Sequence, residues 1–534
     1  MAQTSIRRLP VGIQSFKEIR KKNYAYVDKT AFVWKLVNEG YKFCYFSRPR
    51  RFGKSLLIDT LQTYLEGRKD FFEGLNIMQL EHDWVKHPVI RLDMSGAGAD
   101  ALSLRAYLEN VFSIYEATYA IVPAKVTSLA VRFMNIILEA ERQTGEQVAV
   151  LVDEYDSPLL HSWHTPEHEA CTTIYREVFS ILKMLDEKEC FVFISGITKF
   201  TQISLFSSLN NLTNISFLPE YATLCGLTQE EISSNFPTHI KRLADANGWT
   251  VDEAVNQLKE YYDGYHFCGT NMTDVYNPYS VIYALERNQL RSYWAESGAT
   301  TLIPKFVDGM ELQMNDFSHC RIEKETLELS DVSSGRAEVF LYQSGYLTIK
   351  SSDEDSYFLG FPDTEVRTAL YSLVTPALTM LSETRVRSLQ SDLRRHLITG
   401  QTAQAITALK ALIADVPYSN ITLASMHMEE RYRLLISTIL NAIGLRVEVE
   451  HMMEDGRIDI VAEAQRFTYV MELKLTKNGG VNVATQQIRE KRYLTPFCDG
   501  TRNVVGLAIE LDDLGHGLVA YNAITLCPPL YQPL

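Results

Sequence analysis

Short apolar runs alternate with amphipathic stretches over the first two hundred residues of the chain. The apolar runs are rich in Val, Ile, Phe and Tyr, and they predict strands over 41–47, 88–94, 147–153 and 190–196. Apolar residues with helical spacing predict helices over 55–65, 102–119, 127–144 and 170–187. Strands that alternate with helices in this way predict an α/β domain with a mainly parallel sheet.

The pattern changes after this region. Residues 228–330 are more helical and rich in Tyr and Asn, 331–361 resembles short strands, and 363–415 is helical again. From about 422 the order is helix, strand, strand, strand, helix, strand, which is a second α/β pattern. We therefore predict three domains: an α/β domain over 1–225, a mostly helical middle region or lid over 226–415, and an α/β domain over 416–534.

Composition narrows the functional classes. A chain of 534 residues with 46% hydrophobic residues is long enough for several cores. A net charge of -14 argues against a protein that coats nucleic acid by bulk electrostatics. The first residues lack the apolar segment of a signal peptide, and no apolar run reaches the length of a membrane span. We expect a cytoplasmic protein without a membrane partner.

The segment between the first predicted strand and helix carries the strongest local motif. It consists of Arg48, Pro49, Arg50, Arg51, Phe52, Gly53, Lys54 and Ser55. A turn of this kind before a helix aims backbone N–H groups at phosphate oxygens, so we predict that these residues bind ATP. Lys54 would reach the β- and γ-phosphates and Ser55 would bind Mg²⁺. Arg48 departs from the usual pattern, which has glycine there. The alternative is a basic surface turn.

A second motif supports this interpretation. The apolar strand over 148–153 ends in Asp153 and Glu154, about a hundred residues after the loop. In such a site Asp153 would hold Mg²⁺, and Glu154 would orient and deprotonate the attacking water. Asp156 follows closely and could cap the next helix. Thr198, with Ser195 and Lys199 as alternatives, lies at the end of the next strand and could sense the γ-phosphate.

Several further motifs give the chain a specific resemblance. They are YAYVDKT at 24–30, SRPRRFGKSLL, VLVDEYDSPL, SGITKFTQISLFSSLNNL, YATLCGLTQEEI, YYDGYHF and VYNPYSV. With them the chain resembles, over nearly its whole length, the AAA-ATPase-like family of gut and anaerobic bacteria. The resemblance implies a P-loop ATPase with a C-terminal PD-(D/E)XK nuclease-like domain. It also implies that arginine in place of the first glycine of the loop is normal in this family.

The last α/β region contains a candidate metal site. In a hairpin whose turn is Gln465–Arg466, two residues lie opposite each other when their numbers have the same sum as the numbers of the two turn residues. Asp459 and Glu472 meet this condition and would therefore lie opposite each other. The two carboxylates could then share a divalent cation, with Lys474 on the same side of the strand as Glu472. This pattern is the D…ExK signature of PD-(D/E)XK nucleases. The alternative is a half-buried strand with solvated charges.

Flanking helices contribute further candidates. Glu429, on a predicted helix over 429–443, could be a third acidic ligand of the metal, and Gln487 could face the site or the DNA backbone. Lysine beside metal-bound carboxylates can activate water, so Asp459, Glu472, Lys474 and Gln487 are the candidate catalytic residues of this region. Acidic residues outnumber basic ones over 421–534, so a face that binds DNA would have to be local.

These observations predict an α/β chain with three parts. They are a P-loop NTPase domain with a parallel sheet, a helical middle region, and a restriction-endonuclease-like domain. The main hypothesis is an ATPase whose nucleotide state gates a nuclease, with ATP and Mg²⁺ as cofactors and Mn²⁺ as an alternative at the nuclease site. DNA is favoured over RNA as the partner, and homo-oligomerisation is left open. The competing hypothesis is a nucleotide-switched scaffold or sensor with an inactive nuclease fold; a nucleotidyl- or phosphotransferase has no further motif in its support.

Overall fold

The computed structural model describes residues 6–122, 128–199, 211–296, 320–329, 336–414, 427–453 and 456–525. The described residues form two compact units: unit 1 extends to Asp363, and unit 2 begins at Thr364. Each unit is considered by itself below. The three-domain division at 225 and 415 stays a prediction.

Unit 1 is built on a parallel five-stranded sheet in the order β2-β3-β4-β1-β5. Its strands are β1 (Phe43–Ser47), β2 (Val89–Asp93), β3 (Val148–Asp153), β4 (Glu189–Gly196) and β5 (Thr213–Asn214). The first four are the four strands predicted from the apolar runs, which confirms the α/β fold. Because all strands are parallel, the phosphate-loop strand β1 and the acidic strand β3 end at the same edge, separated by β4.

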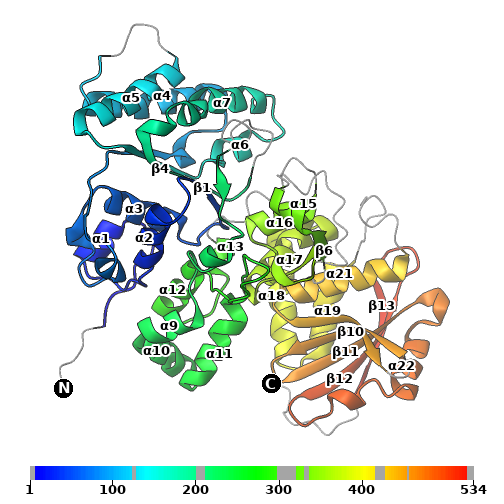
Figure 1. Cartoon of the computed structure of the whole chain (residues 1–534). Coiled ribbons are helices and arrows are strands. Elements are labelled where there is room, and N and C mark those ends of the chain that lie inside the picture. Colours follow the sequence, from blue (N-terminus) through cyan, green and yellow to red (C-terminus); the bar gives the residue numbers. More distant parts are fainter. Residues whose placement is uncertain are drawn as a thin grey trace, which may run out of the picture. The chain divides into compact units, whose positions relative to one another are not determined.

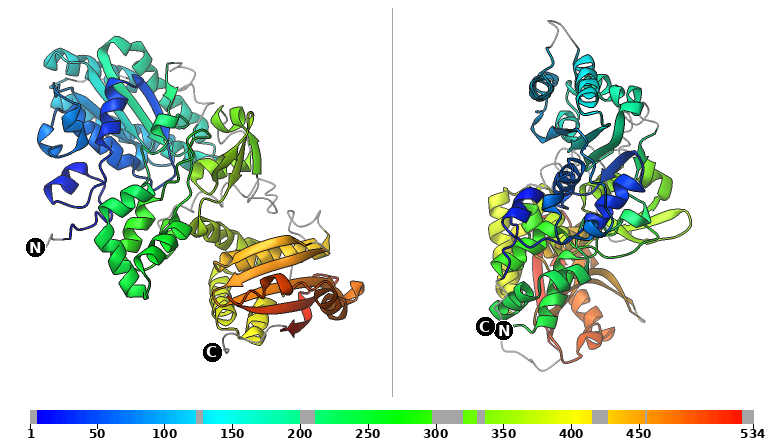
Figure 2. Two further views of the ribbon diagram at one scale, coloured as in Figure 1. Left: turned by 60° about the horizontal axis from the view of Figure 1, so that its bottom comes forward. Right: turned by 60° about the vertical axis from the view of Figure 1, so that its left-hand side comes forward.

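Helices cover both faces of this sheet (Figures 1 and 2). The connection from β1 to β2 runs across the sheet in one direction, and the connections from β2 to β3 and from β3 to β4 run in the other. Right-handed crossovers therefore place α3 on one face of the sheet and α4, α5 and α7 on the other face. The helices of this part are α1 (Phe16–Lys21), α2 (Thr30–Asn38), α3 (Lys54–Leu65), α4 (Ala101–Thr118), α5 (Leu129–Thr144), α6 (Ser157–Ser162) and α7 (His168–Met184).

The rest of unit 1 is helical, followed by a small sheet. The helices are α9 (Gln229–Asn235), α10 (Pro237–Asn247), α11 (Val251–Tyr262), α12 (Pro278–Arg287) and α13 (Tyr293–Glu296). Their apolar faces form one core that also takes in Leu9 and Ala25 of the N-terminal segment. The small antiparallel sheet, in the order β6-β8-β7, comprises β6 (Cys320–Glu323), β7 (Thr348–Ser352) and β8 (Ser356–Gly360), with α15 (Lys324–Leu329) and α16 (Ala337–Ser344).

One local prediction is wrong in part. Short strands are predicted over 331–361, and β7 and β8 are strands, but α16 is a helix; residues 331–335 lie outside the described ranges. The helix is buried over Val339–Ser344, so it lacks the polar face that produces helical periodicity. Its Val, Phe, Leu and Tyr residues resemble a strand for that reason.

Unit 2 contains a mixed five-stranded sheet in the order β13-β12-β11-β10-β9. Its strands are β9 (Arg446–Met453), β10 (Gly456–Ala464), β11 (Phe467–Leu475), β12 (Asn503–Leu511) and β13 (Leu518–Ile524). Its helices are α17 (Thr364–Thr379), α18 (Glu383–Ile398), α19 (Thr402–Leu412), α21 (Met428–Ala442) and α22 (Gly480–Glu490). The predicted order of the last region is confirmed, with β13 as one additional strand.

Helices flank this sheet as well (Figure 1). Helix α21 contacts β9, β10 and β11, while α22 packs on β11, β12 and β13 through a core that contains Val470, Val504 and Ile488. Among the described residues, no helix is both long enough and apolar enough to cross a membrane.

Candidate functional site

The phosphate-binding loop joins β1 to α3. Gly53 has a φ of 92°, which favours glycine, and α3 begins at the next residue. The Lys54 ammonium is buried and donates to the Arg48 and Pro49 carbonyls at 2.8 and 3.0 Å. Burial lowers the pKa of Lys54, although the nearby carboxylates of Glu154, Asp153 and Asp156 oppose this shift. The loop therefore curls around its lysine at a helix N-terminus, as a phosphate site requires.

Arg48 has a different role from the rest of the loop. Its guanidinium is buried and donates to the carbonyls of Ser47, Ser216 and Tyr221 at 2.9, 2.9 and 3.0 Å. The same group lies over the rings of Phe46 and Phe267, at 4.4 and 4.0 Å from their centres. Burial lowers its pKa to about 10. The Arg48 side chain thus anchors the loop to the interior of unit 1 and points away from the loop's open side.

Other loop residues are anchored by the middle of the chain. Phe52 is buried edge-on against the rings of Tyr265 and Phe267, at 4.8 and 5.3 Å between centres. A Cβ atom on Gly345 would lie 2.5 Å from the Pro49 Cβ, so Pro49 packs directly on that glycine. The indole of Trp294 donates to the Arg50 carbonyl at 3.3 Å. The YDGYHF motif thereby supports the loop, which assigns its aromatic residues to packing.

The acidic strand β3 ends beside the loop. Asp153 is 1% exposed, and its Oδ1 accepts from the Ser195 hydroxyl at 2.9 Å and from the Glu154 N–H at 3.0 Å. Arg91 of β2 lies 3.8 Å from Asp153 Oδ2 and also pairs with Asp59 at 3.2 Å. Ser195 therefore orients the Asp153 carboxylate.

Glu154 differs from its neighbours in backbone and direction. Its φ is 48°, a conformation that non-glycine residues rarely adopt. It lines the cleft beside the phosphate loop, whereas Asp153 does not. Burial raises its pKa; the positive charge of Lys54 opposes that shift, and the charges of Asp153 and Asp156 add to it. A raised pKa brings a carboxylate closer to the range suited to a general base.

Asp156 does not act as the helix cap that the sequence suggested. It stands before α6, but its side chain makes no capping bond. Its Oδ2 instead accepts from the Ile197 N–H, the Thr198 N–H and the Thr198 hydroxyl, at 2.9, 2.6 and 2.8 Å. Thr198 is fully buried, its hydroxyl donates to Asp156, and it does not line the cleft beside the loop. A phosphate contact by Thr198 stays a prediction without geometric support.

A cleft of about 300 Å³ runs along the open side of the loop. Of the predicted residues, Arg50, Arg51, Gly53, Lys54, Ser55 and Glu154 line it, and Arg48, Pro49, Phe52, Asp153 and Thr198 do not. The other wall comes from Gly12, Ile13 and Gln14 of the N-terminal segment and from Tyr279 and Tyr283 of α12. The Arg51 guanidinium lies 5.0 Å from the centre of the Tyr279 ring.

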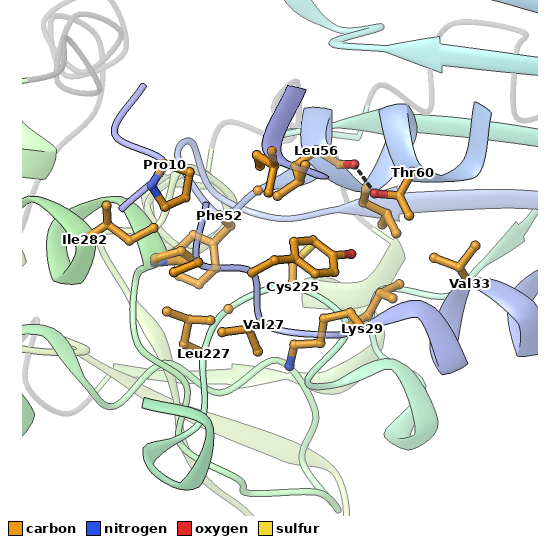
Figure 3. Close-up of a pocket in the computed structure, with 18 of the residues that line it drawn as sticks. Pro10, Val27, Lys29, Val33, Phe52, Leu56, Thr60, Cys225, Leu227 and Ile282 are labelled. Carbon is orange, nitrogen blue, oxygen red and sulfur yellow. Dashed lines mark hydrogen bonds between the residues drawn. The ribbon is translucent and has the colours of Figure 1, made fainter. Parts of the chain in front are cut away.

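A smaller, mainly apolar pocket of about 110 Å³ adjoins the cleft, and Figure 3 shows its lining. The two share Pro10, Gly53, Leu56, Pro278 and Ile282. Lys29 of the YAYVDKT motif lies at this pocket, where its ammonium pairs with Glu231 at 2.6 Å and donates to the Thr223 carbonyl at 2.8 Å. Its charge is thus used within the fold.

In unit 2 the predicted hairpin is present. Residues 460–464 of β10 pair with 471–467 of β11 in the predicted register, and the turn is Gln465–Arg466, with a φ of 49° at Gln465. The regular pairing ends at Ile460 and Met471. One step beyond, the Asp459 Oδ2 accepts from the Leu473 N–H at 2.8 Å.

The acidic and basic groups of the hairpin are close together. Glu472 is 1% exposed, and its Oε1 lies 2.8 Å from the Lys474 ammonium, while Oε2 is buried without a hydrogen-bond partner. Burial, and then the charge of Asp459, raises the pKa of Glu472 to about 7. Burial by itself would lower the pKa of the Lys474 ammonium. The nearby carboxylates of Glu472, Asp459 and Glu429 outweigh the effect of burial and raise that pKa.

Helix α21 adds two groups to this site. The Glu429 carboxylate lies 3.8 Å from the Lys474 ammonium, and one turn later Arg433 contacts Asp459 at 3.3 Å and Glu450 at 2.7 Å. Gln487 of α22 donates to the Tyr493 hydroxyl at 3.1 Å, and that hydroxyl donates to the Arg457 carbonyl at 2.9 Å. Among the described residues, the Gln487 side chain therefore hydrogen-bonds to Tyr493 and not to the carboxylates of Asp459, Glu472 or Glu429.

The donor set fits a hard divalent cation in composition. Glu472 offers a buried oxygen without a partner, beside a second carboxylate that raises its pKa, and a cation would relieve that repulsion. Within the described ranges, however, no three Asp, Glu, His or Cys side chains converge as a ready metal-binding group. Arg433 and Lys474 instead neutralise the carboxylates.

Some residues of both sites were missed in the sequence. Arg91 lies in a predicted strand without a recognised motif, Tyr279 lies in the VYNPYSV motif, to which no role is assigned from the sequence, and Arg433 lies on the predicted helix over 429–443. The (i, i+4) spacing of Glu429 and Arg433 could have placed both on one helix face.

Comparisons with known proteins give matches to two family models, to a relative and to a solved structure. Residues 10–206 match the family model described as predicted AAA-ATPase, and residues 427–514 match that of the PD-(D/E)XK nuclease superfamily. A protein of Azotobacter chroococcum mcd 1, described as an uncharacterized protein in vnfD 5'region, is 30% identical over 532 residues, which cover 95% of this chain and 99% of that protein. A solved Walker-type ATPase of Pyrococcus abyssi is 11% identical, with a TM-score of 0.33 over 66% of this chain and 97% of the other.

These matches cover the two regions in which the phosphate loop and the D…ExK hairpin were found. The relative in Azotobacter extends the likeness along almost the entire chain. The chain belongs to the AAA-ATPase-like family and carries a C-terminal domain of the PD-(D/E)XK nuclease superfamily.

Proposed function

We propose that unit 1 binds and hydrolyses ATP in the cleft beside the phosphate loop. The observation that carries this proposal is the meeting of Lys54, Ser55 and Glu154 in one cleft at the carboxyl edge of a parallel sheet. The N–H groups of the loop and the Lys54 ammonium would hold the phosphates, with Arg50 and Arg51 adding positive charge. Ser55 and Asp153 would hold Mg²⁺, which screens the phosphate charge when it is bound.

Glu154 would position and deprotonate the attacking water. Its carboxylate lines the cleft, and its raised pKa makes it a stronger base than an exposed glutamate. The base of the nucleotide would lie toward the N-terminal segment and α12, where Ile13, Tyr279 and Tyr283 supply apolar and aromatic surface.

We further propose that unit 2 cleaves DNA phosphodiester bonds. Asp459 and Glu472, with Glu429 as a third acidic group, would hold a divalent cation, Mg²⁺ or Mn²⁺, which supplies Lewis-acid activation of the phosphate when it is bound. Lys474 would position the attacking water. Lys477, Arg489 and Arg492 are exposed beside or within α22 and could contact the DNA backbone.

The nucleotide state of unit 1 would gate this nuclease. The test measures cleavage of plasmid and single-stranded DNA with Mg²⁺ or Mn²⁺, with and without ATP, for the wild type, Asp459→Ala and Lys54→Ala. Cleavage that Asp459→Ala abolishes, and that ATP changes in the wild type but not in Lys54→Ala, supports the gated nuclease. Cleavage that ATP leaves unchanged refutes the gating.

One observation favours a second function. The carboxylates Asp459 and Glu472 are paired with Arg433 and Lys474, as they would be in a nuclease fold used for binding alone. In that case unit 1 would act as a nucleotide-controlled switch on a scaffold. Intact ATP binding without cleavage of any DNA or RNA substrate would favour this function.

A further inference from the structure

Three of the four residues in the segment Asp153–Asp156 are hydrogen-bonded to the end of β4 or to the residues that follow it, and Glu154 is the exception. Asp153 accepts from the Ser195 hydroxyl at 2.9 Å, and the Tyr155 N–H donates to the Ser195 carbonyl at 3.0 Å. Asp156 accepts from Ile197 and Thr198. Glu154 is the residue of this segment that lines the cleft, so its direction is set by bonds that its neighbours make.

The backbone of Glu154 needs such support. A φ of 48° at a residue with a Cβ atom costs on the order of 1 kcal/mol, and surrounding contacts must hold it. An extended or helical backbone at this position would turn the carboxylate elsewhere. Its neighbour Asp153 is tied to the Ser195 hydroxyl, and Tyr155 is tied by its N–H to the Ser195 carbonyl and by its hydroxyl to the Thr198 carbonyl. Asp156 adds a further tie between the same two segments, on the other side of Tyr155.

Asp156 ties the end of β3 to the segment after β4 through one carboxylate oxygen. Its Oδ2 accepts three hydrogen bonds from two consecutive residues, at 2.6 to 2.9 Å, and the side chain is 1% exposed. The hydroxyls of Tyr45 and Tyr155 both donate to the Thr198 carbonyl, at 2.8 and 2.9 Å, which fixes the acceptor loop from its other side. A Cβ atom at Gly196 would lie 2.7 Å from Asp156 Oδ1, so glycine is what lets the two segments approach.

We propose that Asp156 is a positioning residue for ATP hydrolysis, which holds Glu154 in the cleft by tying the end of β3 to the segment after β4. The proposal rests on the proposed ATPase function of unit 1. Asp156 does not line the cleft, so it contacts no nucleotide and acts through the backbone of Glu154. Binding of ATP depends on the loop and should not need it, whereas turnover should.

The test compares ATP affinity, measured with a fluorescent ATP analogue, with kcat for steady-state hydrolysis. Asp156→Ala should bind the analogue within about threefold of the wild type but lose about a hundredfold in kcat, the loss typical of a misplaced base. Asp156→Asn should recover most of the rate, because its amide oxygen can accept the same three hydrogen bonds. Glu189→Ala is the matched control: Glu189 is another fully buried carboxylate, at the start of β4, and its loss should leave kcat unchanged.

Several outcomes would overturn the proposal. They are full kcat in Asp156→Ala while Glu154→Gln is inactive, equal loss of affinity and kcat, and Asp156→Asn as inactive as Asp156→Ala. If Asp156→Ala does not fold, Thr198→Val replaces it. It removes one of the three donors and should lower kcat about threefold to tenfold at unchanged affinity; an unchanged kcat would count against the proposal. A wild type that binds ATP but never hydrolyses it would instead refute the proposed function.

Discussion

Arg433 lies 3.3 Å from Asp459 across the space between α21 and β10, so a guanidinium contacts a carboxylate proposed to bind the metal. Arg433 also pairs with Glu450, at 2.7 Å, and Arg457 pairs with the same glutamate at 3.1 Å. A cation that binds Asp459 must compete with Arg433 and therefore has to displace its guanidinium.

Arg433→Gln should consequently bind Mn²⁺ more tightly than the wild type, by about fivefold to tenfold, because one competing charge is removed. Electron paramagnetic resonance of free Mn²⁺ measures this affinity without any need for cleavage. Arg457→Gln is the matched control, because it removes a charge beside Glu450 without touching Asp459. Equal tightening in both variants would assign the effect to net charge and contradict the competition.

Arg48 and Arg50 should respond differently to removal. Arg48→Ala removes a donor from the carbonyls of Ser47, Ser216 and Tyr221, of which the last two bonds are fully buried, so we expect a loss of about 3 kcal/mol in the free energy of unfolding. Arg50→Ala, at the cleft, should keep the wild-type Tm and weaken ATP binding about tenfold. Calorimetry of unfolding and ATP titration separate the two; a lower Tm in both, or in neither, would contradict these roles.

Gly345 should control the phosphate loop from a distance of three hundred residues in sequence. Its φ is 91°, and a Cβ atom there would lie 2.5 Å from the Pro49 Cβ. Gly345→Ala should therefore push the loop and weaken ATP binding at least about fivefold, with a Tm lowered by a few degrees. Gly248→Ala is the control, because that glycine also has a positive φ, of 69°, but has no atom within 4 Å of the added Cβ. Similar ATP affinities in the two variants would contradict the argument.

Asp263 should make the stability of unit 1 depend on pH. Burial, and then the charge of Asp274, raises its pKa to about 7, from an ordinary value near 4. Asp263 therefore binds a proton more tightly in the folded state than in the unfolded state. The stability that this proton contributes is lost as pH rises from about 4 to about 7. Between pH 5.5 and 8 the loss should reach about 2 kcal/mol in the free energy of unfolding.

Asp263→Asn should remove this dependence, because asparagine stays neutral. The measurement is urea unfolding of both proteins at pH 5.5 and pH 8, with Asp245→Asn, an exposed position on α10, as the control. A wild type that is no less stable at pH 8, relative to Asp263→Asn, would show that Asp263 is ionised at an ordinary pKa.

Local sequence patterns predicted the first four strands of unit 1 and the hairpin of unit 2 because each depends on residues near one another. The register of β10 and β11 follows from one two-residue turn, and Asp459 and Glu472 could be paired from it alone. The meeting of Lys54 and Glu154 could likewise be predicted, since parallel strands bring their ends to one edge.

The remaining features depend on partners that only the fold brings together. The direction of Arg48 is set by carbonyls of Ser216 and Tyr221, more than 160 residues away, which no local pattern encodes. The Thr198 hydroxyl donates to Asp156, a partner that is likewise distant in sequence, although a strand-end threonine beside an acidic strand suggested a phosphate contact. Helix α16 was missed because burial over Val339–Ser344 removes the polar face that helical periodicity needs.

Arg48 also limits how this loop can change in evolution. In the usual motif a glycine fills this position and leaves no cavity behind it. Here a mutation of Arg48 to glycine would leave the carbonyls of Ser216 and Tyr221 and the ring of Phe267 around an empty space. The usual glycine would become acceptable only if the 216–221 segment and the YDGYHF motif changed too, so substitutions at these distant positions should occur together among relatives.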